Sequence, residues 1–145
     1  MVAWKSDESF SETNTVLIIS QDAEMVDVWK TLFEQKNFHV VCETSANDAV
    51  QSSRLLAPAL IVLDLPISRT QRVDLCFELR GTTSGTILLL APKGDVTEIS
   101  DYLHAGADEF LSTPISPMAL LIKSMAWLVR QEWVVPKDQS SHLYI

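Results

Sequence analysis

One unbroken apolar run that ends on a carboxylate constrains the fold of this chain more than any other feature. Residues 59–63 are all apolar, and Asp64 and Leu65 follow them directly. A strand this apolar must be covered on both faces, as the central strands of parallel sheets are. Open α/β sheets bind their ligands just outside the carboxyl ends of such strands. Asp64 is therefore the first candidate functional residue, although a lone aspartate at this position is also a common turn or helix-capping residue.

Further strands and helices are expected to alternate around this run. Short stretches of apolar and β-branched residues indicate four more buried strands, which lie at residues 15–19, 38–42, 86–90 and 110–111. Apolar residues at helical spacing predict a helix after each strand. The helices are expected to begin directly after Asp22, after Ser45, at about residue 73, at Gly94 and after Ser116. A polar loop is expected at residues 66–72, before the third helix. The pattern predicts a doubly wound α/β fold with five parallel strands and five helices.

Composition favours a single domain with a substantial core. The chain has 145 residues, of which 47% are hydrophobic, and its net charge is −8. An acidic domain lacks the basic surface that nucleic acid binding requires. No apolar run is long enough to span a membrane, and the first residues do not form a signal peptide. Cys42 and Cys76 are too few for a disulfide framework, so we expect two buried, reduced thiols in a cytoplasmic protein.

The domain is expected to cover residues 15–131, because no composition shift interrupts that range and the last helix should end near Gln131. Residues 1–14 are rich in serine, glutamate and aspartate without periodicity, which favours a flexible tail. Residues 132–145 are expected to form a second tail or a linker toward an output domain in a longer protein.

The order and spacing of several short segments resemble the receiver domains of two-component response regulators. The resemblance rests on the strand that ends at Asp64, on residues 93–95, on residues 105–111 and on the Thr113-Pro114 pair. Each segment is a weak indication alone, but together they are specific. The resemblance covers residues 15–131 and implies the flavodoxin-like topology of that family.

The resemblance also implies roles for particular residues. In the family, the aspartate that matches Asp64 accepts a phosphoryl group from a histidine kinase with the help of Mg²⁺, a cation that takes oxygen ligands. Phe110 matches the aromatic switch residue, with an ordinary packed aromatic as the alternative. The bond before Pro114 matches one that is commonly cis, a geometry essentially restricted to proline.

Other positions depart from the family pattern. Ser20 and Gln21 stand where the family has two adjacent acidic residues that help to hold the metal. Ala91 replaces a hydroxyl residue, Thr113 replaces a lysine, and Arg72 replaces a glycine. Asp22 is left, with Asp64, as a weak metal candidate. Two unit charges about 4 Å apart interact by roughly 1–4 kcal/mol, so these losses remove several kcal/mol from a phosphorylated, metal-bound state.

We therefore expect a degenerate acidic pocket with no cofactor. Replacing carboxylates at the sheet edge relieves repulsion, so the edge should be stable without a cation. Arg72 is expected to reach toward Asp64 and to compensate its charge in place of the metal. Mg²⁺ is expected only if Asp64 still accepts phosphate.

The last helix carries more apolar residues than one buried stripe requires, which favours an interface. The interface candidates are Leu121, Met125, Trp127 and Leu128. In the family the fourth helix, fifth strand and fifth helix commonly form the dimer face, so a homodimer through these elements is expected. Contacts within the chain, from Trp4 or from the C-terminal tail, are the alternative.

Other functional classes find less support in the sequence. No glycine-rich phosphate loop follows the first strand, where residues 20–22 stand, so a dinucleotide or P-loop enzyme is not expected. His39, His104 and His142 lack the spacing of metal ligands. We expect a non-enzymatic, atypical receiver that acts in signal transduction and transcription regulation by protein–protein contact. A conventional receiver phosphorylated on Asp64 and a flavodoxin-like cofactor-binding protein are the alternatives.

Overall fold

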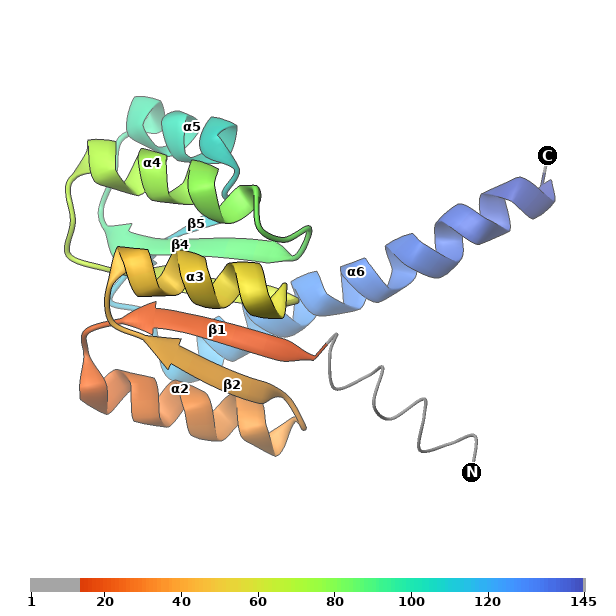
Figure 1. Cartoon of the computed structure of the whole chain (residues 1–145), viewed down its shortest axis with the longest axis horizontal. Coiled ribbons are helices and arrows are strands. Elements are labelled where there is room, and N and C mark those ends of the chain that lie inside the picture. The colour runs from red at the N-terminus through yellow and green to blue at the C-terminus, as the bar shows by residue number, and fades with distance from the viewer. Residues whose placement is uncertain (1–13, 145) are drawn as a thin grey trace.

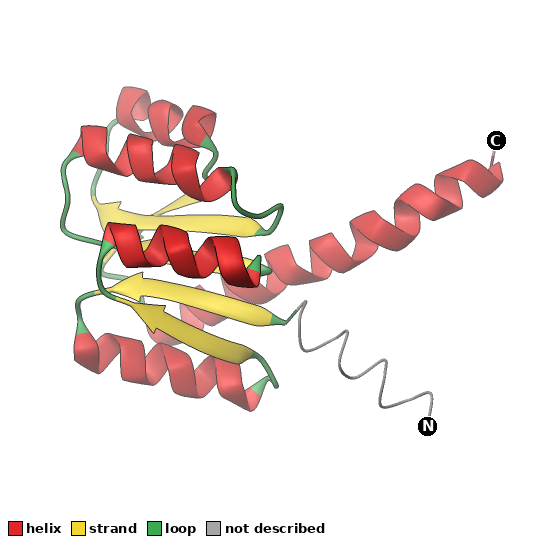
Figure 2. Ribbon diagram, viewed as in Figure 1, coloured by secondary structure: helices red, strands yellow, loops and turns green. Residues whose placement is uncertain are grey.

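A five-stranded parallel sheet forms the centre of the molecule (Figures 1 and 2). The structure is a computed structural model that describes residues 14–144, with side chains as far as Gln131. The strand order is β2-β1-β3-β4-β5, and the strands are β1 (Thr15–Ser20), β2 (His39–Glu43), β3 (Leu60–Asp64), β4 (Thr86–Pro92) and β5 (Glu109–Thr113). The predicted α/β fold with a central strand ending at Asp64 is confirmed.

Helices cover both faces of the sheet. They are α2 (Ala23–Gln35), α3 (Ala46–Leu56), α4 (Arg69–Arg80), α5 (Val96–Ala105) and α6 (Pro117–Tyr144). Figure 1 shows α3, α4 and α5 on one face and α2 and α6 on the other. Side chains alternate along each strand, so Leu17 and Ile19 pack in the core under the first group of helices, and Val16 and Ile18 pack under the second.

Polar side chains begin the helices, and three of them are the residues after which the sequence predicts a helix. Asp22, Ser45 and Ser116 each accept a hydrogen bond from the backbone N–H three residues later. Asp95 does the same for α5, which begins at Val96 instead of the predicted Gly94. The predicted loop at residues 66–72 is wrong in its second half. Ser68 forms a capping box with Gln71, so α4 begins at Arg69. Arg72 is therefore a helical residue.

The last helix is longer than predicted. Its backbone remains helical to Tyr144 instead of ending near Gln131. No glycine follows Gln131 to end the helix, and the helical backbone continues past Pro136. Where α6 passes the sheet, the Gln131 side-chain amide donates to the Ala59 carbonyl at 2.9 Å and to the Thr86 hydroxyl. These contacts attach the helix to the amino-terminal edge of the sheet.

The two thiols lie in different environments. Cys76 is buried under α4, as expected, but Cys42 is exposed, because it lies on the edge strand β2. Both are free. Within the described range, no helix combines the length and apolar character needed to cross a membrane.

Candidate functional site

Asp64 and Ser20 meet at the carboxyl edge of the sheet. They are the last residues of β3 and β1, and the parallel register places them side by side. The Ser20 hydroxyl donates a hydrogen bond to Asp64 Oδ2 at 3.3 Å and accepts one from the Asp22 N–H at 3.1 Å. Ser20 is buried and Asp64 is half-buried. A serine thus contacts Asp64 where the family pattern places a metal-binding carboxylate.

The two residues after Ser20 are directed to other partners. Asp22 caps α2, and one of its carboxylate oxygens accepts the Met25 N–H at 3.1 Å. The Gln21 side chain donates to the Thr44 carbonyl at 3.1 Å, on the loop after β2. Asp22 is the only carboxylate of the two residues, but one of its oxygens already accepts the helix-capping hydrogen bond.

Arg72 lies beside the site without pairing with Asp64. No ion pair joins the two side chains among those the structure describes, so Arg72 does not compensate the Asp64 charge by direct contact. The guanidinium donates instead to the Tyr102 hydroxyl at 3.3 Å, and its Nε is buried without a partner. Arg72 is held there because α4 starts early and turns this residue toward α5.

These side chains line a hollow of about 520 Å³ at the sheet edge. Its lining comprises Ser20, Gln21, Asp22, Asp64, Leu65, Pro66, Arg72, Pro92 and Thr113. The only cationic member of this set is Arg72. The structure thus brings together the positions assigned to the acidic pocket from the sequence, apart from Ala91, which is buried in β4.

Burial raises the pKa of Asp64 above its ordinary value. The hydrogen bond from Ser20 and the charge of Arg72 act in the opposite direction, while the negative charge of Asp22 raises the pKa further. The net direction shows that nearby cations and donors do not fully compensate the ionised carboxylate. A bound divalent cation would act in the opposite sense.

The donor set at this edge offers few ligands for Mg²⁺. Octahedral Mg²⁺ takes oxygen ligands, usually including one or two carboxylates. Among residues 14–131, no group of three or more His, Cys, Asp or Glu side chains is arranged to hold a metal. Asp64 and the capping Asp22 are the two carboxylates of the hollow.

The switch candidate Phe110 packs against Tyr102, a residue that the sequence patterns did not single out. Their rings are stacked, with centroids 5.9 Å apart. The Tyr102 hydroxyl accepts from Arg72 and donates to Glu98 at 2.6 Å. The four-residue spacing of Glu98 and Tyr102 on one helix was the available signal. A two-position role for Phe110 stays a prediction. The Thr113-Pro114 bond is cis, as expected.

The interface candidates on α6 divide into two groups. Leu121 and Leu128 are buried in the core against the sheet, so they are unavailable to a partner. Met125 and Trp127 are partly buried, and the Trp127 indole donates to Glu109 at 2.7 Å. Among the side chains of this helix up to Gln131, the exposed large apolar ones are Met118, Ile122 and Val129. The helix thus has a second apolar stripe, but not at the leucines expected.

Comparison with known sequences gives one consistent result. The sequence model of the response regulator receiver domain matches residues 16–124. The DNA-binding response regulator MtrA of Mycobacterium tuberculosis is 26% identical over 117 residues, covering 81% of this chain and 51% of MtrA. The transcriptional regulatory protein CpxR of Klebsiella pneumoniae is 28% identical over 122 residues, covering 83% and 51%, respectively. The chain spans about half the length of these relatives.

Solved structures agree on the fold. A two-component response regulator from Clostridium difficile aligns with a TM-score of 0.74 at 24% identity, covering 82% of this chain and 98% of the other. A CheY-like receiver domain protein from Methanospirillum hungatei gives 0.74 at 20% identity, covering 83% and 97%. The beryllofluoride-activated NtrC4 receiver domain dimer gives 0.71 at 18% identity, covering 81% and 98%.

Proposed function

The chain belongs to the receiver domain family of response regulators, and we propose that it is an atypical member that signals by protein contact without depending on phosphorylation of Asp64. Two-component signalling is the setting that family membership gives. Within that setting, the chain acts as a binding module whose surface is recognised by a protein partner rather than as a catalyst.

The surroundings of Asp64 carry this proposal. Among the described residues, the carboxylate has one side-chain hydrogen-bond partner, Ser20, and the one cation that lines its hollow, Arg72, donates to Tyr102. Phosphorylation replaces the single negative charge of the carboxylate by about two on an acyl phosphate, so the site must hold about one further negative charge. Each missing opposite charge at about 4 Å forgoes roughly 1–4 kcal/mol. Thr113 supplies no ammonium group where the family has a lysine, and Ala91 supplies no hydroxyl where the family has one.

A homodimer through α5, β5 and α6 is part of the proposal. Met118, Ile122 and Val129 lie four and seven residues apart, which places them on one exposed face of α6. A stripe of this kind favours association. Sedimentation of the chain should show a dimer at high concentration, and Ile122→Glu should shift it to monomer. A monomeric chain at the highest concentration would contradict this part.

A longer protein is the proposed context. The relatives are about twice the aligned length and include proteins described as DNA-binding. We propose that the domain acts in the cytoplasm ahead of a DNA-binding output domain and so contributes to transcription regulation. Its net charge of −8 favours no direct contact with nucleic acid.

A conventional receiver, phosphorylated on Asp64 by a histidine kinase, is the second candidate. It is favoured by the position of Asp64 at the carboxyl end of β3, beside an open hollow. In that case Mg²⁺ would bind at Asp64, with Asp22 as a weak second ligand.

Acetyl phosphate separates the two candidates. The chain is incubated with acetyl phosphate and Mg²⁺, and its intact mass is compared with that of Asp64→Ala. We expect no mass gain of one phosphoryl group in either protein. The variant Ser20→Asp/Gln21→Asp/Ala91→Thr/Thr113→Lys, which restores the family's pocket residues, is the positive control and should gain the mass. A gain in the unmodified chain that Asp64→Ala abolishes would establish the conventional receiver instead.

A further inference from the structure

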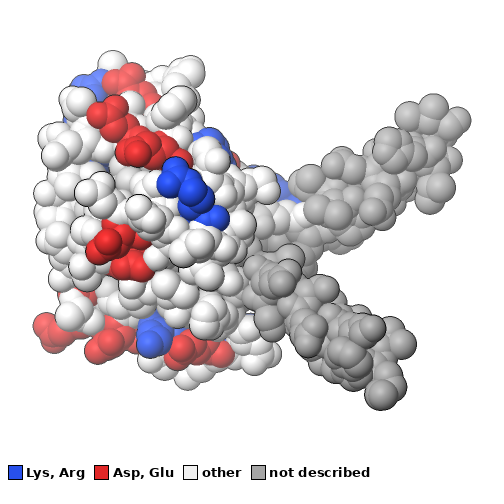
Figure 3. Space-filling view, in the orientation of Figure 1, with Lys and Arg blue, Asp and Glu red and all other residues white. Residues whose placement is uncertain are grey.

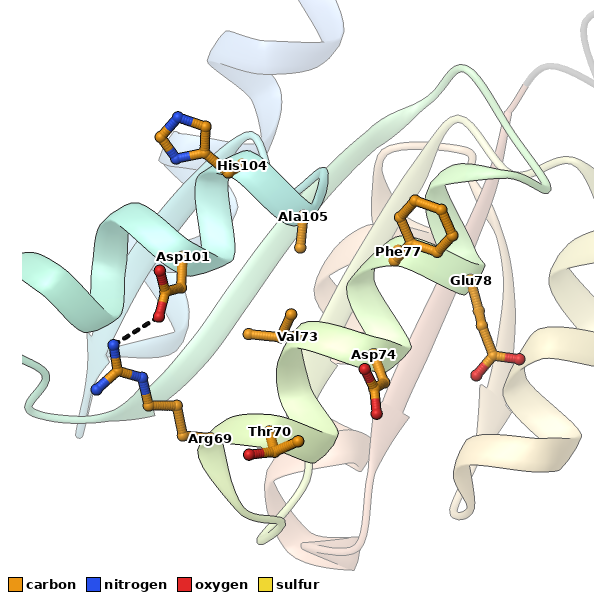
Figure 4. A pocket seen from close by; sticks show the side chains of 9 residues that line it. All are labelled: Arg69, Thr70, Val73, Asp74, Phe77, Glu78, Asp101, His104 and Ala105. Atoms are coloured by element: carbon orange, nitrogen blue, oxygen red, sulfur yellow. Dashed lines mark hydrogen bonds and ion pairs between the residues drawn. The ribbon is translucent and has the colours of Figure 1, made fainter.

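A second hollow lies between α4 and α5 and shares no lining residue with the Asp64 site (Figure 4). It is open and measures about 800 Å³. Val73 on α4 and Ala105 at the end of α5 point toward each other across its floor (Figure 4). Phe77, one turn after Val73, stands at its edge with 72% of its surface exposed.

Phe77 is not required by the core. Helix α4 packs one buried stripe against the core of the domain, made of Leu75, Cys76 and Leu79. Phe77 points away from that stripe, next to the apolar floor of the hollow. A large aromatic side chain beside a concave apolar surface is the kind of feature that dominates binding energy in protein interfaces.

The rim of the hollow is acidic. Asp74 and Glu78 lie one turn apart on α4, and neither forms an ion pair within the part of the chain whose side chains are described. Asp101 of α5 is paired with Arg69 of α4 at 2.5 Å, which joins the two helices at one end of the hollow. Figure 3 shows acidic side chains gathered over the region of α4 and α5.

We propose that this hollow binds a cationic amphipathic helix of a partner protein. One large apolar side chain of that helix would pack against Val73, Phe77 and Ala105, and a lysine or arginine would meet Asp74 and Glu78. The furrow between two helices suits a helical ligand, which presents apolar and charged residues on adjacent stripes. Charge complementarity selects a basic partner because the two carboxylates on α4 are not neutralised within the described chain.

This site differs from the α5–β5–α6 face and does not involve Asp64. Its occupation therefore needs neither dimerisation nor phosphorylation, and a failed binding test leaves the proposed receiver function unaffected. The remaining occupant to consider is a second copy of this chain, which the experiment addresses directly.

The test uses the full chain and a fluorescein-labelled helical peptide of about 15 residues, built from leucine and lysine around one central phenylalanine. Fluorescence anisotropy measures its affinity, and amide NMR shifts locate its site. Phe77→Ser and Asp74→Lys/Glu78→Lys should each weaken binding roughly tenfold. Leu55→Ser on α3 and Asp27→Lys/Glu34→Lys on α2 replace equally exposed residues elsewhere and should change affinity less than about twofold.

Four results would overturn the proposal. Equal binding of a peptide with glutamate in place of lysine would remove the charge argument. Unchanged affinity in Phe77→Ser, with the variant melting at the same temperature, would remove the apolar contact. Shifts spread over α2 or α6 would place the peptide elsewhere. Self-association of the chain that Phe77→Ser alone abolishes would assign the hollow to a second copy.

Discussion

Replacing Asp64 by asparagine should stabilise the folded chain at neutral pH. Burial raises the pKa of this carboxyl, so its ionised form is less favourable in the folded state than in the unfolded state. Asparagine removes the charge and keeps an oxygen that can accept the Ser20 hydroxyl in the same place. The repulsion from Asp22 is relieved too, at the loss of a weak attraction to Arg72.

The expected gain is about 1 kcal/mol in the free energy of unfolding. Polar groups buried without full compensation cost about 1–3 kcal/mol in mutational data. Asp64 is only half-buried and keeps one hydrogen bond, so solvent screening places the gain at the lower end of that range. For a chain of this size, about 1 kcal/mol raises Tm by roughly 3 °C.

The pH dependence has a definite sign. Because the folded chain binds the Asp64 proton more tightly, the unmodified chain loses stability as pH rises from the unfolded value of 3.8 through the raised folded pKa. The advantage of Asp64→Asn should therefore be full at neutral pH and vanish below about pH 3.8. Thermal unfolding at several pH values measures the difference, with Asp27→Asn on the exposed face of α2 as control.

Two outcomes would refute this reasoning. A lower Tm for Asp64→Asn at neutral pH would mean that the carboxylate is well compensated in the folded state. An equal advantage at low pH would mean that the charge is not the cause. A Tm rise on adding Mg²⁺, seen in the unmodified chain but not in Asp64→Asn, would point to a metal site.

Three further predictions concern the rest of the fold. Burial raises the pKa of Cys76 to about 12, so the native chain should show one thiol, the exposed Cys42, that reacts with an aromatic disulfide reagent. The variant Cys42→Ser should be unreactive until it is denatured. Fast reaction of that native variant would contradict the buried placement of Cys76. A Cβ on Gly85 would lie 2.2 Å from the Pro58 carbonyl oxygen, so Gly85→Ala should lower the free energy of unfolding by about 2–4 kcal/mol in urea titrations. A change under about 0.5 kcal/mol would show that the backbone around Gly85 relaxes to make room for the methyl group. Tyr102→Phe should cost about 1–2 kcal/mol, because two charged side chains lose their shared hydroxyl partner, and unchanged stability would show that solvent replaces it.

The sequence predicted the sheet and the place of the site because those depend on local patterns. A short apolar run bounded by turn residues, such as residues 60–63, favours a buried strand, and parallel strands align their carboxyl ends. Asp64, Ser20 and Thr113 therefore meet where expected. The family comparison supplied the remaining constraint, since it fixes which strand ends are neighbours.

The contacts of individual side chains were harder to predict. Arg72 was expected near Asp64, but the Ser68 cap shifted the start of α4 and gave the guanidinium a tyrosine partner instead. The prediction that Leu121 and Leu128 face a partner is wrong, because the width of the buried face depends on how the helix packs on the sheet, which periodicity alone does not determine. The role of Tyr102 is not predictable from the sequence because Arg72, which donates to its hydroxyl, lies 30 residues away on another helix.

Helix α6 is attached to the sheet at Gln131 and extends beyond this attachment. The helix beyond this residue extends for about 20 Å, since each helical residue adds about 1.5 Å. Because Gln131 is bonded to backbone before β3 and to the first residue of β4, the direction of this extension depends on how the amino-terminal ends of those strands lie. A rotation of the helix by about 5° about Gln131 would move its far end by nearly 2 Å.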